Sequence, residues 1–97
     1  MALGDVKYEA ERQAREAKAR PGKVCTLIYT SGTTGNPKAC MISHDNVTWT
    51  AKVVGQVFKL TTDDRFVSYL PLSHIAAQML DIHAPMAFCA SVFFAQP

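Results

Sequence analysis

Apolar residues recur along the chain with two different periods, which predict where helices and strands lie. Helical spacing or strongly helix-forming composition covers residues 6–20, 44–58 and 73–82. Short runs of apolar and β-prone residues cover 24–30, 39–42, 65–70 and 91–95. Because the two kinds of segment alternate, we predict a layered α/β fold.

The first predicted helix, Val6–Arg20, is rich in good helix formers but has a thin apolar face dominated by alanines. Pro21 and Gly22 then stop the helix. We therefore expect residues 1–23 to form a poorly packed, solvated N-terminal helix. The remaining residues, 24–97, are expected to form part of a separate domain.

The second predicted helix has a clear start and one apolar face. Ser43 suits the N-cap position, and Asp45 places a negative charge in the first turn, where the helix dipole favours it. The apolar residues that recur at helical spacing are Val47, Ala51, Val54 and Phe58. We expect this face to be buried.

The segments predicted as strands contain few residues suited to contact with water. Val24–Thr30 has the sequence VCTLIYT, and we expect it to be buried on both faces. The longest apolar stretch, Pro85–Ala95, has about half the length of a membrane-spanning helix. A buried strand is therefore expected there, and no transmembrane segment is predicted.

Composition and charge exclude several classes of protein. Apolar residues make up 48% of the chain, which argues against disorder throughout. Ten basic side chains against eight acidic ones give a net charge of only +2, which provides no electrostatic reason to expect nucleic acid binding. Cys25, Cys40 and Cys89 lack metal-binding spacing, so no metal site is predicted, and they fit reduced thiols in the cytosol.

A loop rich in hydroxyl groups and glycine follows the first predicted strand. Its candidate phosphate-binding residues are Thr30, Ser31, Gly32, Thr33, Thr34, Gly35 and Lys38. Small residues let backbone N–H groups approach a phosphate chain, hydroxyl groups add donors, and lysine adds positive charge. Gly32 and Gly35 permit backbone angles closed to other residues. The pattern favours polyphosphate binding over the alternative, an ordinary hydrophilic turn.

Two common nucleotide-binding motifs do not fit this loop. When the Walker A pattern GxxxxGKS/T is aligned from Gly32, Pro37 replaces its second glycine and Ala39 its final hydroxyl residue. GxGxxG is absent. From Tyr29 to Lys38 the loop instead resembles, without a gap, the phosphate-binding motif of the AMP-binding, or adenylate-forming, superfamily.

A second motif and its surroundings narrow this resemblance. Residues 69–75, YLPLSHI, resemble the next core motif of the superfamily, at the expected distance downstream. The flanks SHDNVTWTA (43–51) and SYLPLSHIAAQMLDI (68–82) are similar to long-chain fatty acyl-CoA synthetases, most closely the bubblegum subgroup. The resemblance covers 24–97 and implies part of the family's large N-terminal domain.

The resemblance also implies a reaction and roles for individual residues. Members of the family form an acyl-adenylate from a fatty acid and ATP, release pyrophosphate, and transfer the acyl group to coenzyme A. By this match the loop 30–38 holds the ATP phosphates and offsets charge as pyrophosphate leaves. His74 would border the acyl and phosphate pockets, in a gating or positioning role rather than in proton transfer. A cytoplasmic location is implied, either free or peripherally attached to the endoplasmic reticulum or another membrane.

The chain departs from the family pattern in two ways. Ala39 stands where the motif ends in glycine, and if that position needs a positive φ, alanine costs about 1 kcal/mol or more. The family's magnesium-binding Glu, adenine pocket, ribose-binding Asp and catalytic lysine have no counterpart in these 97 residues. No complete catalytic site is therefore expected, and the Mg²⁺ ligands would lie outside this chain.

These departures leave three hypotheses about the chain. The first is a fragment of a long-chain fatty acid–CoA ligase that contributes the phosphate loop and is inactive alone. The second is a short, non-catalytic product that binds or interferes with a protein partner. The third, an unrelated P-loop NTPase, conflicts with the failed Walker A comparison.

Overall fold

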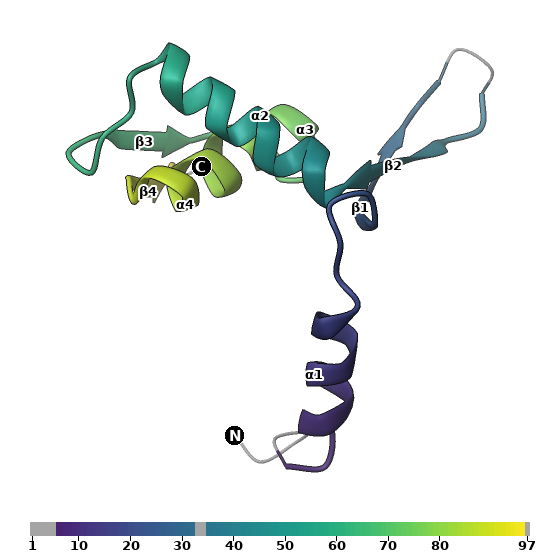
Figure 1. Cartoon of the computed structure of the whole chain (residues 1–97). Helices are drawn as coiled ribbons and strands as arrows, with labels where there is room; N and C mark the ends of the chain where they lie inside the picture. Colours follow the sequence, from purple (N-terminus) through teal and green to yellow (C-terminus); the bar gives the residue numbers. More distant parts are fainter. Residues whose placement is uncertain (1–5, 33–34, 97) are drawn as a thin grey trace.

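The computed structural model describes residues 6–32 and 35–96, in which helices and strands alternate (Figure 1). The helical segments are α1 (Glu9–Ala17), α2 (His44–Val57), α3 (Ile75–Gln78), the π-helical η1 (Met79–His83) and α4 (Ala84–Phe88). The strands are β1 (Val24–Thr30), β2 (Lys38–Ser43), β3 (Arg65–Ser68) and β4 (Ser91–Phe94). This alternation confirms the predicted α/β character.

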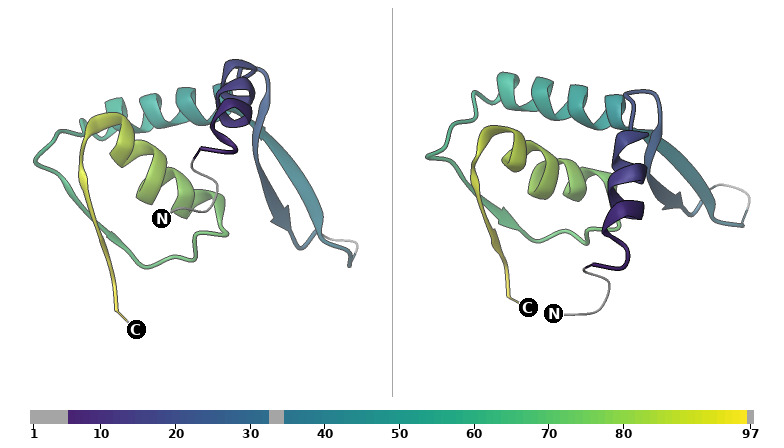
Figure 2. Two further views of the ribbon diagram at one scale, coloured as in Figure 1. Left: turned by 90° about the horizontal axis from the view of Figure 1, so that it is seen from below. Right: turned by 60° about the horizontal axis from the view of Figure 1, so that its bottom comes forward.

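Helix α1 lies away from the other helices and the hairpin in Figure 1 and in the right-hand view of Figure 2, and none of its residues is buried. Local charge pairs lie along the helix: Arg12 bridges Glu9 and Glu16, and Arg15 pairs with Glu11. Arg12 also lowers the pKa of Glu9. Exposed pairs of this kind stabilise a helix only slightly. The helix is shorter than the predicted range 6–20.

Strands β1 and β2 form an antiparallel hairpin in which Thr30 pairs with Lys38 and Tyr29 with Ala39. The extent of β1 matches the prediction, but the expected burial on both faces is wrong. Only Ile28 of this strand is buried, whereas Tyr29 is 66% exposed. The reason is that the hairpin is a two-stranded sheet by itself and extends away from the helices (Figure 1).

Helix α2 begins at the predicted cap. The Ser43 hydroxyl accepts a hydrogen bond from the Asn46 N–H at 3.1 Å, and the Ser43 N–H donates to Asn46 Oδ1 at 3.0 Å. This reciprocal capping box satisfies two backbone N–H groups at the helix start. Val47 and Ala51 are buried as predicted, but Phe58 is 67% exposed because it lies at the end of the helix.

Strands β3 and β4 are parallel neighbours joined by the helical segments α3, η1 and α4. The predicted helix 73–82 begins at Ile75 and continues through α4 to Phe88. The apolar stretch 85–95, expected to be a buried strand, therefore divides into a helical and a strand part. Its strand part is also more exposed than expected, with Phe94 at 65%.

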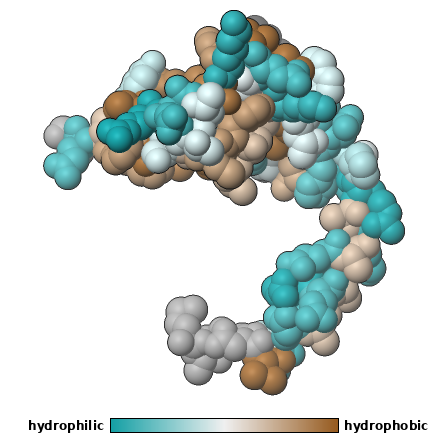
Figure 3. All heavy atoms as spheres, turned by 60° about the vertical axis from the view of Figure 1, so that its left-hand side comes forward, coloured by the Kyte–Doolittle hydropathy of each residue, from teal (hydrophilic) through white to brown (hydrophobic). Residues whose placement is uncertain are grey.

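The core is small and lies where α2 packs on η1 and α4. Its apolar members outside the hairpin are Val47, Ala51, Ala77, Met79 and Ala84. The radius of gyration is 16.2 Å, whereas a compact domain of this length has about 13 Å. Figure 3 shows apolar side chains on the surface of the body and a mostly hydrophilic α1. The described residues therefore form an open structure.

None of the described helices combines the length and the hydropathy needed to cross a bilayer.

Candidate phosphate-binding site

The predicted phosphate loop connects the two strands of the hairpin. Ser31 and Gly32 follow β1, and Gly35 precedes β2; Thr33 and Thr34 lie outside the described residues. Gly32 has a φ of 58° and Gly35 a φ of 89°. Glycine takes such left-handed angles more readily than other residues do. A Cβ atom at Gly35 would meet nothing within 4 Å, so its backbone angle, rather than lack of space, favours glycine there.

Lys38 lies at the other end of the loop, opposite Thr30 in the hairpin register. Both residues are exposed. The ion pairs found among residues 6–32 and 35–96 all lie in α1, and Lys38 takes part in none of them. Its ammonium group is therefore available to an anion that approaches the loop.

Ala39 does not need a positive φ. It lies inside β2, where it pairs with Tyr29, and its backbone is extended. The cost of about 1 kcal/mol considered for a left-handed alanine therefore does not arise. In this chain the glycine-dependent turn ends before β2 begins.

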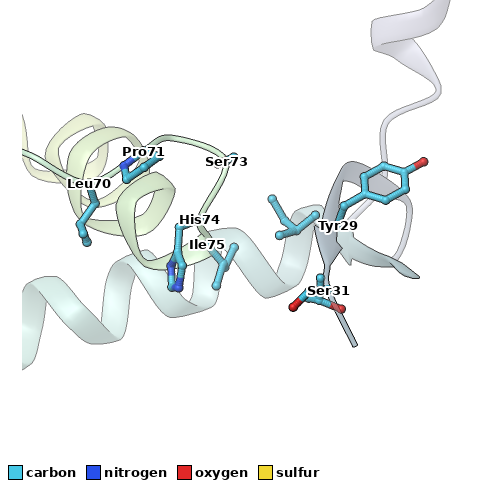
Figure 4. A pocket seen from close by; sticks show the side chains of 9 residues that line it. Tyr29, Ser31, Leu70, Pro71, Ser73, His74 and Ile75 are labelled. Carbon is cyan, nitrogen blue, oxygen red and sulfur yellow. The ribbon is translucent and has the colours of Figure 1, made fainter. Parts of the chain in front are cut away.

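A pocket of about 440 Å³ joins the hairpin to the second motif. One wall comes from the end of β1 and the start of the loop, and the other from the segment that precedes and begins α3. The lining residues are Ile28, Tyr29, Thr30, Ser31, Leu70, Pro71, Ser73, His74 and Ile75. In Figure 4, Ser31 lies on the hairpin side and His74 and Ile75 on the helical side, while the Tyr29 ring points away.

This pocket brings together some of the predicted site residues and not others. Thr30 and Ser31 share the pocket with His74, whereas Gly32, Gly35 and Lys38 lie farther along the hairpin and do not line it. The pocket is also lined by Leu70, Pro71, Ser73 and Ile75, which were not among the predicted site residues. The signal was nevertheless present, because all four belong to the motif at 69–75.

His74 has a defined hydrogen bond at the start of α3. Its Nδ1 accepts from the backbone N–H of Ala76 at 3.1 Å. A neutral imidazole that accepts at Nδ1 carries its proton on Nε2, so the ring can still donate one hydrogen bond. His74 is exposed. This arrangement fits a residue that positions a ligand.

Among the described residues, no three His, Cys, Asp or Glu side chains gather where they could hold a metal ion.

Comparisons with known proteins agree with both motifs. A model of the AMP-binding enzyme family matches residues 2–97. The chain is 56% identical to the long-chain-fatty-acid–CoA ligase ACSBG2 of Gallus gallus over 82 aligned positions, which cover 80% of this chain and 11% of that protein. It is 45% identical to ACSBG1 of Homo sapiens over 101 aligned residues, which cover 100% of this chain and 14% of that protein.

Solved structures share the fold. ATP-bound MatB from Rhodopseudomonas palustris superposes with a TM-score of 0.72 at 27% identity, over 80% of this chain and 15% of that chain. MenE from Bacillus subtilis in complex with AMP gives a TM-score of 0.72 at 29% identity, over 80% of this chain and 20% of that chain. The chain thus spans only a small part of the proteins that it matches.

Proposed function

Because the chain belongs to the AMP-binding enzyme family, we propose that it supplies the ATP phosphate-binding loop of a long-chain fatty acid–CoA ligase. The observation that carries this proposal is the pocket where the start of the loop meets the second motif. Ser31 and His74 come from distant parts of the sequence and line the same hollow. The matching relatives are named as ligases of this type.

The loop offers what a triphosphate requires. Left-handed glycines at positions 32 and 35 turn the backbone so that successive N–H groups can face one anion. Lys38 adds a positive charge with no carboxylate partner among the described residues. These groups would offset the negative charge that develops when pyrophosphate leaves ATP. Thr33 and Thr34 are assigned to the same task from the sequence alone.

The other substrates belong to the proposed whole enzyme. A long-chain fatty acid would be activated as its adenylate and then passed to the thiol of CoA. The apolar wall of the pocket, formed by Leu70, Pro71 and Ile75, is compatible with an acyl chain close to the phosphates. The Mg²⁺ ligands are proposed to lie outside this chain.

We propose that the 97 residues alone are inactive. Catalysis needs reacting groups held in one geometry, and the open structure leaves many large apolar side chains exposed, Tyr69 at 78% among them. For the whole enzyme we propose a cytoplasmic location with peripheral membrane attachment, which follows from the family resemblance.

The binding proposal can be tested by NMR on the ¹⁵N-labelled chain. Pyrophosphate and ATP should shift the amide signals of Ser31, Gly32 and Gly35, and AMP should not. Lys38→Ala should weaken both interactions, whereas Lys52→Ala, on the exposed side of α2, should not. If AMP shifts the same signals as ATP, or if Lys38→Ala has no effect, the loop does not recognise the phosphate chain.

A protein-binding role is the second candidate. It is favoured by the exposed apolar side chains of the parallel sheet, such as Val67 and Phe93, which are paired neighbours in its register. Blotting cell extracts with an antibody to residues 24–97 distinguishes the protein-binding role from the ligase function. A band far larger than 10.6 kDa supports the ligase, and a band at this mass supports a short product with a protein partner.

A further inference from the structure

The segment that carries His74 is held at two points by one helical stretch. Ser68, the last residue of β3, immediately precedes this segment, and Leu72 lies within it. Ser68 bonds to Asp81, and the Leu72 carbonyl bonds to Gln78. Both partners come from the α3–η1 stretch that begins directly after His74.

The bond between Ser68 and Asp81 is short and shielded. The Ser68 hydroxyl donates to Asp81 Oδ2 at 2.6 Å, and Ser68 is only 4% exposed. A hydroxyl-to-carboxylate bond of this length is charge-assisted and stronger than a neutral one. The Ser68 carbonyl also accepts from the Ala95 N–H at 2.8 Å. The start of the His74 segment is thus tied both to the helical stretch and to the residue that follows β4.

The bond to Gln78 fixes the middle of the segment. Gln78 Nε2 donates to the Leu72 carbonyl at 2.8 Å. Gln78 and Asp81 are three residues apart on a continuous helical stretch, so they lie on one face of it. Between them the helix changes from α to π geometry at Met79, and such changes frequently occur near functional sites.

We propose that Gln78 and Asp81 are positioning residues for His74. Together with Ser68 they form a loop clamp, which fixes residues 69–74 so that the His74 ring faces the pocket it shares with Ser31. Neither Gln78 nor Asp81 lines that pocket, so they act through the segment that they hold. The clamp proposal rests on the proposed ligase function, in which His74 must face the pocket that it shares with the phosphate loop.

The test is NMR of the full 97-residue chain with ¹⁵N-labelled histidine. In the wild type, His74 should show separate signals for an accepting Nδ1 and a protonated Nε2. Asp81→Leu and Gln78→Met should each merge these signals toward an average, because the ring loses its fixed bond to Ala76. Asp81→Asn keeps an acceptor for Ser68 and should retain the wild-type signals.

Matched controls separate positioning from general stability. Asp63→Leu and Gln56→Met change the same residue types at exposed positions with no side-chain acceptor or donor role in the described hydrogen bonds, and they should leave His74 unchanged. If Asp81→Leu unfolds the chain, the signals of Gln78→Met and Asp81→Asn still show whether the clamp positions His74. The proposal is overturned if Gln78→Met leaves the His74 signals as in wild type, or if Asp81→Asn disturbs them as Leu does.

The histidine measurement needs no nucleotide, so it is independent of the test of phosphate binding. If the clamp variants alter His74 while ATP shifts no loop amide of the wild type, the clamp holds and the phosphate-loop proposal fails. If ATP shifts the loop amides and the clamp variants leave His74 unchanged, the phosphate-loop proposal holds and the clamp proposal fails.

Discussion

The ring of Phe88 lies directly over Gly55, where a Cβ atom would come within 1.8 Å of Phe88 Cε2. This contact joins the last turn of α2 to α4, and Gly55 is buried. Glycine inside a helix normally costs roughly 1 kcal/mol relative to alanine. Here the missing side chain permits the two helices to pack closely, so the residue that weakens the isolated helix supports the tertiary contact.

We expect Gly55→Ala to destabilise the chain, although alanine is the better helix former. Overpacking of this kind costs typically 1–3 kcal/mol, and the ring must move to make room. The measurement is the free energy of unfolding in urea. Gly22→Ala, where a Cβ atom meets nothing within 4 Å, is the matched control and should be nearly neutral. Adding Phe88→Leu should recover part of the loss; if it does not, the clash is not the cause.

A glycine at the left-handed residue that follows α2 should stabilise the chain. Lys59 has a φ of 53°, its N–H donates to the Gln56 carbonyl, and the Leu60 N–H donates to the Gly55 carbonyl. This is the Schellman pattern, in which glycine is preferred at the left-handed residue. Lys59→Gly should raise the free energy of unfolding by about 1 kcal/mol. Lys52→Gly, inside α2, should lower the free energy of unfolding by about as much. If both substitutions change it in the same direction, this explanation is wrong.

Restoring the family's glycine at position 39 should not improve nucleotide binding. Ala39 is an extended residue of β2 paired with Tyr29, so glycine would add only flexibility, at a cost of roughly 0.5–1 kcal/mol. Gly35→Ala should instead weaken binding, because its φ of 89° disfavours a side chain. Pyrophosphate titrations followed by amide shifts compare the two. Tighter binding by Ala39→Gly would show that the loop is strained in this chain.

Stability should fall as the pH is lowered, partly through His83. Burial lowers the pKa of His83 below its ordinary value of 6.5. The unfolded chain therefore binds more protons than the folded chain once the pH falls below about 6.5. The contribution is fully present above that pH and is lost as the pH falls toward the folded-state pKa. Between about pH 7.5 and pH 5, the free energy of unfolding measured in urea should decline less steeply for His83→Gln than for the wild type. Identical slopes would show that His83 does not contribute to this pH dependence.

Much of the secondary structure could be predicted because it depends on short-range features. The β-prone run 24–30 forms β1 with the predicted bounds, and Ser43 caps α2 as its side chain suggests. Both features act within a few residues. The ends of α2 and α4 were less clear, because non-glycine residues, Lys59 and Cys89, take the left-handed angles there.

Burial was predicted less well, because it depends on what packs against each element. Tyr29 and Phe94 belong to strongly apolar runs, yet both are largely exposed. An apolar run indicates that a segment favours removal from water. It does not identify the neighbour that covers the segment, and the two-stranded sheets of this chain leave such faces open.

The sequence by itself determined the family, because the loop at 29–38 and the motif that contains His74 are contiguous runs of residues with a specific pattern. Only the tertiary structure decided that Ser31 and His74 share one pocket, that Asp81 holds Ser68, and that Phe88 lies over Gly55. These contacts join residues far apart in the chain. They depend on how the helical segments between β3 and β4 pack against α2. The local spacing of apolar residues does not predict this packing.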